Sequence, residues 1–322
     1  MINADLTPST TAPLREIARG LNFPEGPIAM RDGTVLLVEI GRGTLSRVWP
    51  DGRVDVVADL GGGPNGAAIG PDGAAYVCNS GGFEFTDVNG INTPHYQPAD
   101  YRGGSIQRVV LDGPDAGAAT ELYTHCDGRR LRGPNDIVFD ADGGFWFTDL
   151  GKTRRRDVDT GALYYATPDG GSITEVVHPL TQPNGVGLSP DGTRLYVAET
   201  GPGRVWYWDV TGPGRLEPPE RPIGPGGAGL LHGFAGYQPL DSLAVDGAGN
   251  VCVATLVTGA VSVLAPDGTL ERQVPVPEPD PFVTNICFAG ADSNTAYITS
   301  SGLGRLYVTE WDGPGIDLAF RA

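Results

Sequence analysis

The sequence predicts an all-β fold: a six-bladed β-propeller with four-stranded antiparallel blades around a central channel. Two observations lead to this fold class. The 322-residue chain contains 49 Gly and 28 Pro, yet 40% of its residues are hydrophobic and they occur in short, regularly spaced runs. One pattern, two apolar strands around an acidic or Gly-containing turn, also recurs six times. Both observations are typical of many short strands joined by tight turns.

Each copy of the repeat opens with a polar residue, often after Pro, that leads into the first apolar strand. The first polar residues of successive copies are 40, 70, 49, 57 and 44 residues apart. A third strand introduced by Gly and a weaker fourth strand follow each pair, which is the spacing of propeller blades rather than of a solenoid or a sandwich. The six copies begin at Pro24, Pro64, Pro134, Pro183, Leu240 and Thr284.

We expect residues 1–322 to form a single propeller domain with two long loop insertions. The long second interval holds the first insertion, at about 80–104, which we expect to lie over one face. A Gly/Pro-rich stretch at about 211–237 is expected to be the second loop. Leu14–Ala18 precedes the first copy, so it can supply the outer strand that closes the ring and protects a sheet edge.

Composition limits the partners of this chain. Its 22 Lys and Arg against 39 Asp and Glu give a formal net charge of −17, which argues against a nucleic-acid partner. Its four cysteines form no CxxC pair and are expected to be free thiols. Neither a signal-peptide pattern nor a long apolar run is present, so we expect a cytoplasmic protein with no membrane partner. No pattern indicates the oligomeric state.

The repeat geometry predicts a functional site at one mouth of the channel. The two strands of each repeat form a hairpin, so the residue before the first strand and the residue after the second lie at the same end. The first strand of a propeller blade usually lines the axis, so one polar residue from each repeat is expected to converge there. These residues are Glu25, Asn65, Asn135, Asn184, Asp241 and Asn285. An outer set follows the second strands: Glu39, Asn79, Asp149, Glu199, Thr255 and Ser300.

The chemistry of the inner set favours a divalent cation. Two close carboxylates repel each other unless one is protonated or both bind a cation, and Glu25 and Asp241 would balance a 2+ charge. Oxygen donors without His or Cys favour a hard cation such as Ca²⁺. Any one of these residues, taken alone, is better explained as a turn cap. Six of them at one register favour a site.

Four segments around these residues resemble the SMP-30/gluconolactonase/luciferin-regenerating-enzyme family of six-bladed propellers, over about Phe23 to Tyr307. The segments are FPEGP with Glu25, RGPNDIVFD with Asn135, PNGVGLSPDG with Asn184 and LDSLAVD with Asp241. The resemblance implies that Glu25, Asn184 and Asp241 bind a divalent cation and that Asn135 binds the cation or touches substrate. Ca²⁺ is the expected cation, with Mg²⁺, Mn²⁺ and Zn²⁺ left open.

The resemblance also implies an enzyme, a metal-dependent lactonase that hydrolyses a small cyclic ester. The expected substrate is a sugar-type lactone. Asp241 is the expected general base. The residues expected to contact this small-molecule substrate are Asn65, Arg132, Asn135, Asp136 and Asn285. Three alternatives stay open: lyase, isomerase or bond-forming chemistry in the same pocket, hydrolysis of organophosphates or aryl esters, and a scaffold without catalysis.

The aromatic residues of the 80–104 insertion have two interpretations. They can form a lid or specificity wall over the mouth, or they can pack only against one another in a surface loop. The residues concerned are Phe83, Phe85, His95, Tyr96 and Tyr101.

Overall fold

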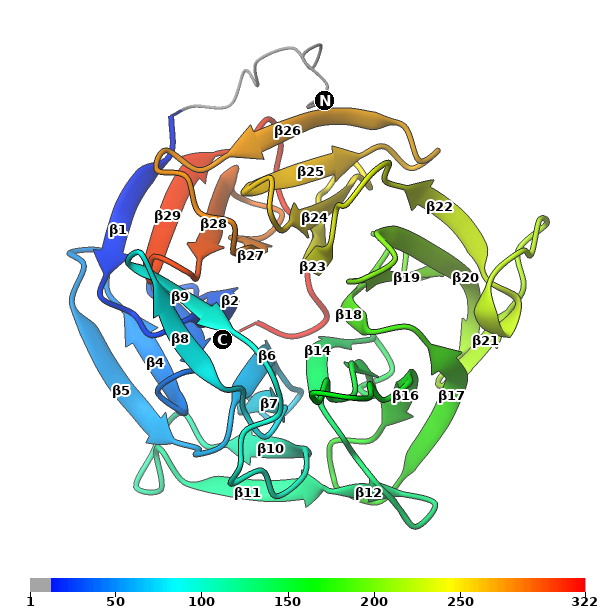
Figure 1. Cartoon of the computed structure of the whole chain (residues 1–322), viewed down its shortest axis with the longest axis horizontal. Coiled ribbons are helices and arrows are strands. Elements are labelled where there is room, and N and C mark those ends of the chain that lie inside the picture. The colour runs from blue at the N-terminus through cyan, green and yellow to red at the C-terminus, as the bar shows by residue number, and fades with distance from the viewer. Residues whose placement is uncertain (1–12, 322) are drawn as a thin grey trace.

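The computed structural model describes residues 13–321 and is a six-bladed β-propeller, which confirms the predicted fold class (Figure 1). Blade 1 consists of β2 (Pro24–Ala29), β3 (Val35–Glu39), β4 (Thr44–Val48) and β5 (Val54–Asp59). Blade 2 consists of β6 (Pro64–Ile69), β7 (Ala75–Asn79), β10 (Ser105–Val109) and β11 (Ala119–Tyr123). Blade 3 consists of β14 (Pro134–Phe139), β15 (Phe145–Asp149), β16 (Gly161–Ala166) and β17 (Ile173–Leu180).

The second half of the ring follows the same order from the axis outward. Blade 4 contains β18 (Pro183–Leu188), β19 (Arg194–Glu199), β20 (Arg204–Gly212) and β21 (Arg215–Glu217). Blade 5 contains β23 (Leu240–Val245), β24 (Val251–Thr255), β25 (Ala260–Leu264) and β26 (Leu270–Pro275). Blade 6 contains β27 (Val283–Phe288), β28 (Thr295–Ser300), β29 (Arg305–Glu310) and β1 (Arg15–Arg19).

The ring is closed by its first strand. Strand β1 pairs antiparallel with β29, and Arg15 lies opposite Val308. The chain therefore supplies the outer strand of its last blade from its N-terminal side, as the position of Leu14–Ala18 predicts. Closure pairs β29 on both sides, so this strand does not present an unpaired edge.

The two expected loops are in part strands. Within 80–104, β8 (Phe85–Val88) and β9 (Ile91–Pro94) pair as a separate hairpin. The stretch at 211–237 is not one long loop: it contains β21, the short 3₁₀ helix η1 (Pro225–Gly227) and β22 (Gly229–Gly233). Strand β22 pairs with β20, so blade 4 has five strands. The Gly and Pro residues of 211–237 indicated a loop in the sequence because such residues are depleted in strand interiors.

Hydrophobic clusters fill the spaces between neighbouring blades. Trp146 and Trp208, both fully buried, belong to the cluster between blades 3 and 4, and Tyr76 and Phe145 to the cluster between blades 2 and 3. Fully burying each large apolar side chain stabilises the fold by about 1.5–3 kcal/mol. Packed interfaces on both sides of every blade thus fix the positions of the inner strands.

Two smaller expectations can be compared with the fold. The four cysteines are free, and three of them are buried: Cys78, Cys126 and Cys252. Between residues 13 and 321, no helix combines the length and the apolar character that crossing a membrane requires. A short two-stranded sheet of β12 (His125–Cys126) and β13 (Arg129–Arg130) lies between blades 2 and 3 in the chain.

Candidate functional site

The six inner strands share a local irregularity where they carry their polar residue. In each blade, the pairing between the first and second strands shifts register at this point, for example between Pro64 and Ala67 and between Pro183 and Val186. The other four blades show the same shift. Such bulges bend a strand and redirect side chains. The repeat therefore encodes a bulge that presents one polar side chain from every blade.

Three glycines allow the inner strands to approach closely at this level. A Cβ atom on Gly26 would lie 2.6 Å from the carbonyl oxygen of Asn65, and one on Gly66 would lie 2.5 Å from that of Asn135. On Gly185, a Cβ would lie 2.5 Å from the backbone nitrogen of Leu243. Real Cβ atoms do not occupy such positions, so each glycine permits contact with the neighbouring blade. The sequence carries this signal, a Gly directly after Glu25, Asn65 and Asn184, but it resembles a turn.

Glu25 is held in a defined orientation. It is 1% exposed, and its Oε2 accepts hydrogen bonds from Nδ2 of Asn285 at 2.8 Å and from the backbone nitrogen of Gly26 at 2.5 Å. Its Oε1 is buried without a hydrogen-bond partner. Burial, with a further contribution from the Asp241 carboxylate, raises the pKa of Glu25 well above its ordinary value. One carboxylate oxygen is therefore anchored, and the other is free for a ligand.

The asparagines of the inner set differ in what their side chains already bind. Asn65 and Asn135 are buried, and Oδ1 of each lacks a hydrogen-bond partner. Asn184 donates from Nδ2 to Thr200 at 3.1 Å, and its Oδ1 accepts a long bond of 3.4 Å from the Ser242 hydroxyl. Buried acceptors without partners are rare and indicate an absent water, ion or ligand.

Asp241 is the second carboxylate of the inner set, and as a residue it is partly exposed, whereas Glu25 is buried. Burial of its carboxyl group raises the pKa of Asp241 to about 8, and the Asp136 carboxylate adds to this effect. Hydrogen bonds from the Asn184 side chain and the Ser242 backbone act in the opposite direction. A carboxyl group with this pKa can exchange a proton near neutral pH.

Asp136 lies beside the ring and joins blade 3 to blade 4. Its Oδ1 accepts the backbone N–H of Ile137 at 3.0 Å, and its Oδ2 accepts that of Val186 at 3.1 Å. Burial raises the pKa of Asp136 to about 7, against the effect of these two bonds. Both oxygens are thus engaged by the backbone. Both polar ends of Asn285 are also occupied, since its Oδ1 accepts the backbone N–H of Ile286 at 2.8 Å and its Nδ2 donates to Glu25.

The donor set fits a hard cation. Three buried oxygens without partners come from three consecutive blades: Oε1 of Glu25, Oδ1 of Asn65 and Oδ1 of Asn135. Within residues 13–321, no three side chains of the His, Cys, Asp and Glu types gather in a metal-holding arrangement. A cation here would therefore depend on two carboxylates, Glu25 and Asp241, together with carboxamide oxygens, which is oxygen-only chemistry suited to Ca²⁺.

Comparison with known proteins identifies the family. The profile of the SMP-30/gluconolactonase/LRE-like region matches residues 23–302. The chain belongs to this family. A lactonase drp35 of Staphylococcus saprophyticus is 33% identical over 282 residues, covering 85% of this chain and 76% of its own. A gluconolactonase of Zymomonas mobilis is 25% identical over 321 residues, covering 90% and 80% of the two chains.

Solved structures of other proteins share the fold of this family member. A gluconolactonase from Xanthomonas campestris superposes with a TM-score of 0.70 at 23% identity, covering 92% of this chain and 89% of its own. A calcium-binding regucalcin from Agrobacterium tumefaciens superposes with a TM-score of 0.66 at 18% identity, covering 92% and 94% of the two chains. At these identities, the likeness shows the fold alone.

The side chains of the outer set form hydrogen bonds with the loops around the mouth rather than with the inner set of polar residues. Glu39 accepts the backbone N–H of Asn22 at 2.8 Å, and Asp149 accepts those of Arg132 and Gly133 at 2.7 Å each. The same function is performed by Glu199 with Thr181 and by Asn79 with Gly63. Glu39 and Glu199 also pair with Arg42 and Arg204. These side chains fix the loops that surround the mouth in this family member.

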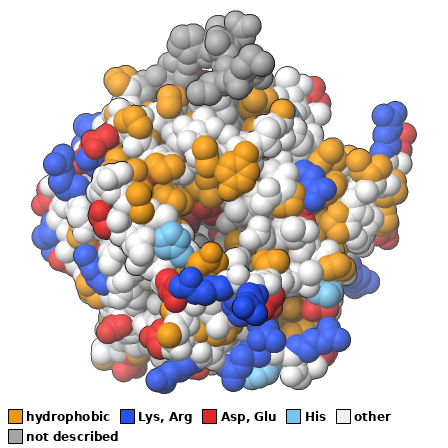
Figure 2. Space-filling model, viewed as in Figure 1, with side chains coloured by type: hydrophobic (Ala, Val, Ile, Leu, Met, Phe, Trp, Pro, Cys, Tyr) orange, Lys and Arg blue, Asp and Glu red, His pale blue; other side chains and the backbone are white. Residues whose placement is uncertain are grey.

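The mouth is bordered by aromatic residues from several segments. Phe23, directly before β2, lies 5.2 Å from Phe85 of the insertion and 5.7 Å from Phe282 before β27, between ring centroids. Figure 2 shows a hollow near the centre of this face, with acidic atoms at its base and hydrophobic side chains along much of its rim. Arg132 is exposed, and its carbonyl oxygen accepts a hydrogen bond from the Tyr101 hydroxyl at 2.5 Å. The insertion therefore packs against the propeller and not only against itself.

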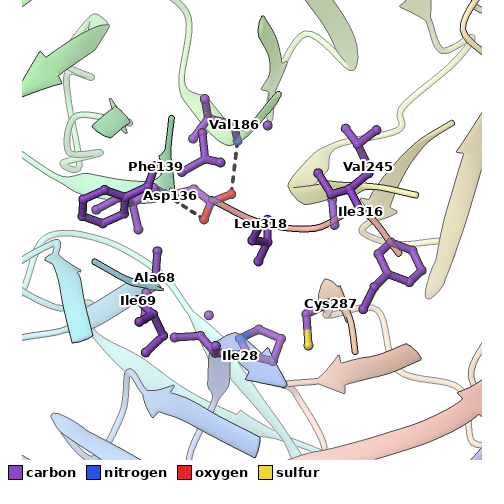
Figure 3. Close-up of a pocket in the computed structure, with 18 of the residues that line it drawn as sticks. Ile28, Ala68, Ile69, Asp136, Phe139, Val186, Val245, Cys287, Ile316 and Leu318 are labelled. Atoms are coloured by element: carbon purple, nitrogen blue, oxygen red, sulfur yellow. Dashed lines mark hydrogen bonds between the residues drawn. The ribbon is translucent and has the colours of Figure 1, made fainter. Parts of the chain in front are cut away.

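The C-terminal tail closes the other end of the channel. Beyond the ring, the channel contains an apolar cavity of about 110 Å³, lined by inner-strand residues such as Ile28 and Ile69 and by Ile316–Arg321 of the tail (Figure 3). Phe320 packs edge-on against Phe139 at 5.7 Å. The position of the tail was not predicted from the sequence, although the chain carries the apolar run IDLAF near its C-terminus. The tail therefore lies at the end of the channel opposite the face that carries the insertion.

Proposed function

We propose that this chain is a divalent-cation-dependent hydrolase of small cyclic esters, with Ca²⁺ as the cation and a sugar-type lactone as the substrate. The observation that carries the cation is the pair of unpartnered buried oxygens on Glu25 and Asn135, with the Asp241 carboxylate close to that of Glu25. Lactone hydrolysis is supported by the relatives named lactonase and gluconolactonase, which align over most of the chain.

The residues that would hold the cation are Glu25, Asn135, Asn184 and Asp241. A bound Ca²⁺ would polarise the ester carbonyl and stabilise the negative charge that develops on its oxygen. Asn285 and the Gly26 backbone hold Glu25 in the orientation that leaves Oε1 free. Thr200 and Ser242 similarly orient the carboxamide of Asn184.

Asp241 is proposed as the general base. Its carboxylate removes a proton from the attacking water. The resulting carboxyl group can return that proton to the alkoxide that leaves when the lactone ring opens. With the cation bound, the Asp241 carboxyl group would be ionised, which is the form that accepts the proton. Asn65 Oδ1, buried without a partner, can accept a hydrogen bond from a substrate hydroxyl.

Two further groups border the proposed substrate pocket. Arg132 is exposed on the rim and can neutralise the carboxylate of the hydroxy-acid product as it leaves. Asp136 acts indirectly, by fixing the backbone next to Asn135 and Val186. Asn285 also acts indirectly, through Glu25.

A substrate panel tests this proposal. Acid release should be followed at constant pH with a sugar lactone, an aliphatic lactone, an aryl ester and a phosphotriester, each with Ca²⁺ and with EDTA. We expect Ca²⁺-dependent turnover of lactones, fastest with the sugar lactone. Turnover that EDTA leaves unchanged would refute the cation, and turnover of the aryl ester or phosphotriester alone would refute the substrate class.

A further inference from the structure

Lys152 is the only lysine in the chain, and it is 1% exposed. It lies just after β15, at the mouth end of blade 3. All other basic side chains apart from His are arginines. The lysine ammonium is a compact charge, whereas the arginine guanidinium is a broad planar fork. Because the single lysine occupies a fully buried position, we infer that this position fits the compact ammonium group better than a guanidinium group.

The ammonium group of Lys152 is enclosed by the insertion. Its Nζ donates to the carbonyl oxygen of Gly82 at 2.7 Å and lies 3.5 Å from the hydroxyl of Ser80. It also lies 4.2 Å from the ring centroid of Phe83 and 5.5 Å from that of Tyr101. Ser80, Gly82 and Phe83 form the start of the insertion and Tyr101 lies near its end. One side chain of blade 3 thus holds both ends of this segment.

Enclosing this amine is costly. Burial lowers the pKa of Lys152 to about 7, although Asp149 and Asp159 act in the opposite direction. A desolvated cation–π contact contributes about 2 kcal/mol and only partly offsets such a cost. The protein therefore keeps a contact at the base of the insertion that disfavours the charged amine. A role of Lys152 in positioning the insertion explains why this contact is kept.

Aromatic contacts connect the base of the insertion with the mouth of the channel. Phe83 lies 6.4 Å from Phe85, and Phe85 packs against Phe23, two residues before Glu25. In β9, near the tip of the hairpin, Nδ2 of Asn92 donates a hydrogen bond to Oδ1 of Asn22 at 2.9 Å. The base held by Lys152 and the tip held by the loop before β2 together fix the aromatic wall above the ring.

We propose that Lys152 is a positioning residue that latches the 80–104 insertion over the mouth as a lid. This inference rests on the proposed function only for its effect on catalysis, because the closed lid is a property of the protein itself. Release of the latch should let the lid open, weaken substrate binding and leave the chemical step largely intact.

Hydrogen exchange and kinetics of Lys152→Met test the latch. We expect amide exchange in peptides spanning Gly82–Tyr101 to accelerate by about tenfold or more while the strands of blade 5 keep their protection. KM for the lactone should rise severalfold, with kcat within about twofold of the original. Arg155→Met is the matched control, since Arg155 is exposed and meets the same insertion at its surface, 3.9 Å from Glu84 and 5.2 Å from the ring centroid of Tyr96. Unchanged exchange in a folded Lys152→Met variant would overturn the proposal.

The single lysine permits a second test without substitution at 152. Acylation of the unaltered protein by an amine-reactive ester, followed by mass spectrometry, compares Lys152 with the α-amino group. We expect Lys152 to react slowly, and to react faster in Tyr101→Ala, which removes one wall of the cage. Labelling of Lys152 as fast as the α-amino group would contradict a closed lid. Neither exchange nor labelling depends on turnover, so failure of the lactonase proposal is separable from failure of the latch.

Discussion

Asn285 donates from Nδ2 to Oε2 of Glu25 at 2.8 Å, a bond between two residues 260 positions apart in the chain. It connects the inner strands of blades 6 and 1, the two blades that meet where the ring closes. Because Oε2 is occupied in this way, only Oε1 of Glu25 remains free. The closure of the propeller therefore also orients the carboxylate that we propose as a cation ligand.

Asn285→Ala should weaken cation binding without abolishing it. Loss of the bond lets the Glu25 carboxylate rotate, and outer-sphere partners of this kind are worth about 10–100-fold in metal affinity. Competition with a fluorescent Ca²⁺ chelator would measure the change. Asn79→Ala is a suitable comparison, because Asn79 binds loop N–H groups away from the ring. Equal Ca²⁺ affinity in Asn285→Ala and the original protein would argue against a liganding Glu25.

Asp241→Asn should lower kcat by about 100-fold or more, since general base catalysis contributes roughly 10²–10⁴-fold. The carboxamide keeps the shape of the side chain, so the fold should be retained. Steady-state kinetics with saturating Ca²⁺ separate loss of the base from loss of the cation. Near-normal kcat under these conditions would assign the base elsewhere.

Removal of the cation should make stability depend on pH. In the cation-free protein, the pKa of Asp241 is raised to about 8 and that of Glu25 is also raised. The folded state then retains protons that the unfolded chain loses near pH 4. Because the folded state binds more protons, the free energy of unfolding must fall as pH rises from about 4 to about 8. Ca²⁺ favours the ionised carboxylates and should remove most of this slope.

Thermal unfolding midpoints across this pH range, with EDTA and with Ca²⁺, measure the effect. The difference between the two series isolates the ring acids from surface groups that titrate equally in both. Parallel curves would show that the ring carboxylates do not share a cation.

Gly26→Ala should destabilise the fold by about 2 to 4 kcal/mol, because the new Cβ meets two costs. The backbone at Gly26 has a φ of +50°, and the added Cβ atom would lie 2.6 Å from the backbone carbonyl oxygen of Asn65. Gly73→Ala is the control: its φ is +73°, but nothing lies within 4 Å of the added atom. It should cost only about 1 kcal/mol. Equal losses in urea unfolding would mean that the inner strands can separate freely.

The repeat and the polar position in each copy could be predicted from the sequence because both depend on local periodicity. Burial and pairing do not follow from periodicity. Thus Asn285 was expected to bind substrate, yet both of its polar ends are bonded within the protein, and Asp136 likewise serves the backbone. The strands within 211–237 and the tail at Ile316–Arg321 were missed because tertiary contacts, not local composition, place them.

Calorimetric titration with Ca²⁺ tests the central claim most directly, with the original protein, Glu25→Gln and Glu199→Gln compared. Glu199 is an equally buried carboxylate, but it binds the Thr181 backbone and the Trp206 indole outside the ring. We predict one saturable site per chain, weakened by more than about 100-fold in Glu25→Gln and retained in Glu199→Gln. Absence of saturable binding in the original protein, or equal binding by Glu25→Gln, would contradict the account.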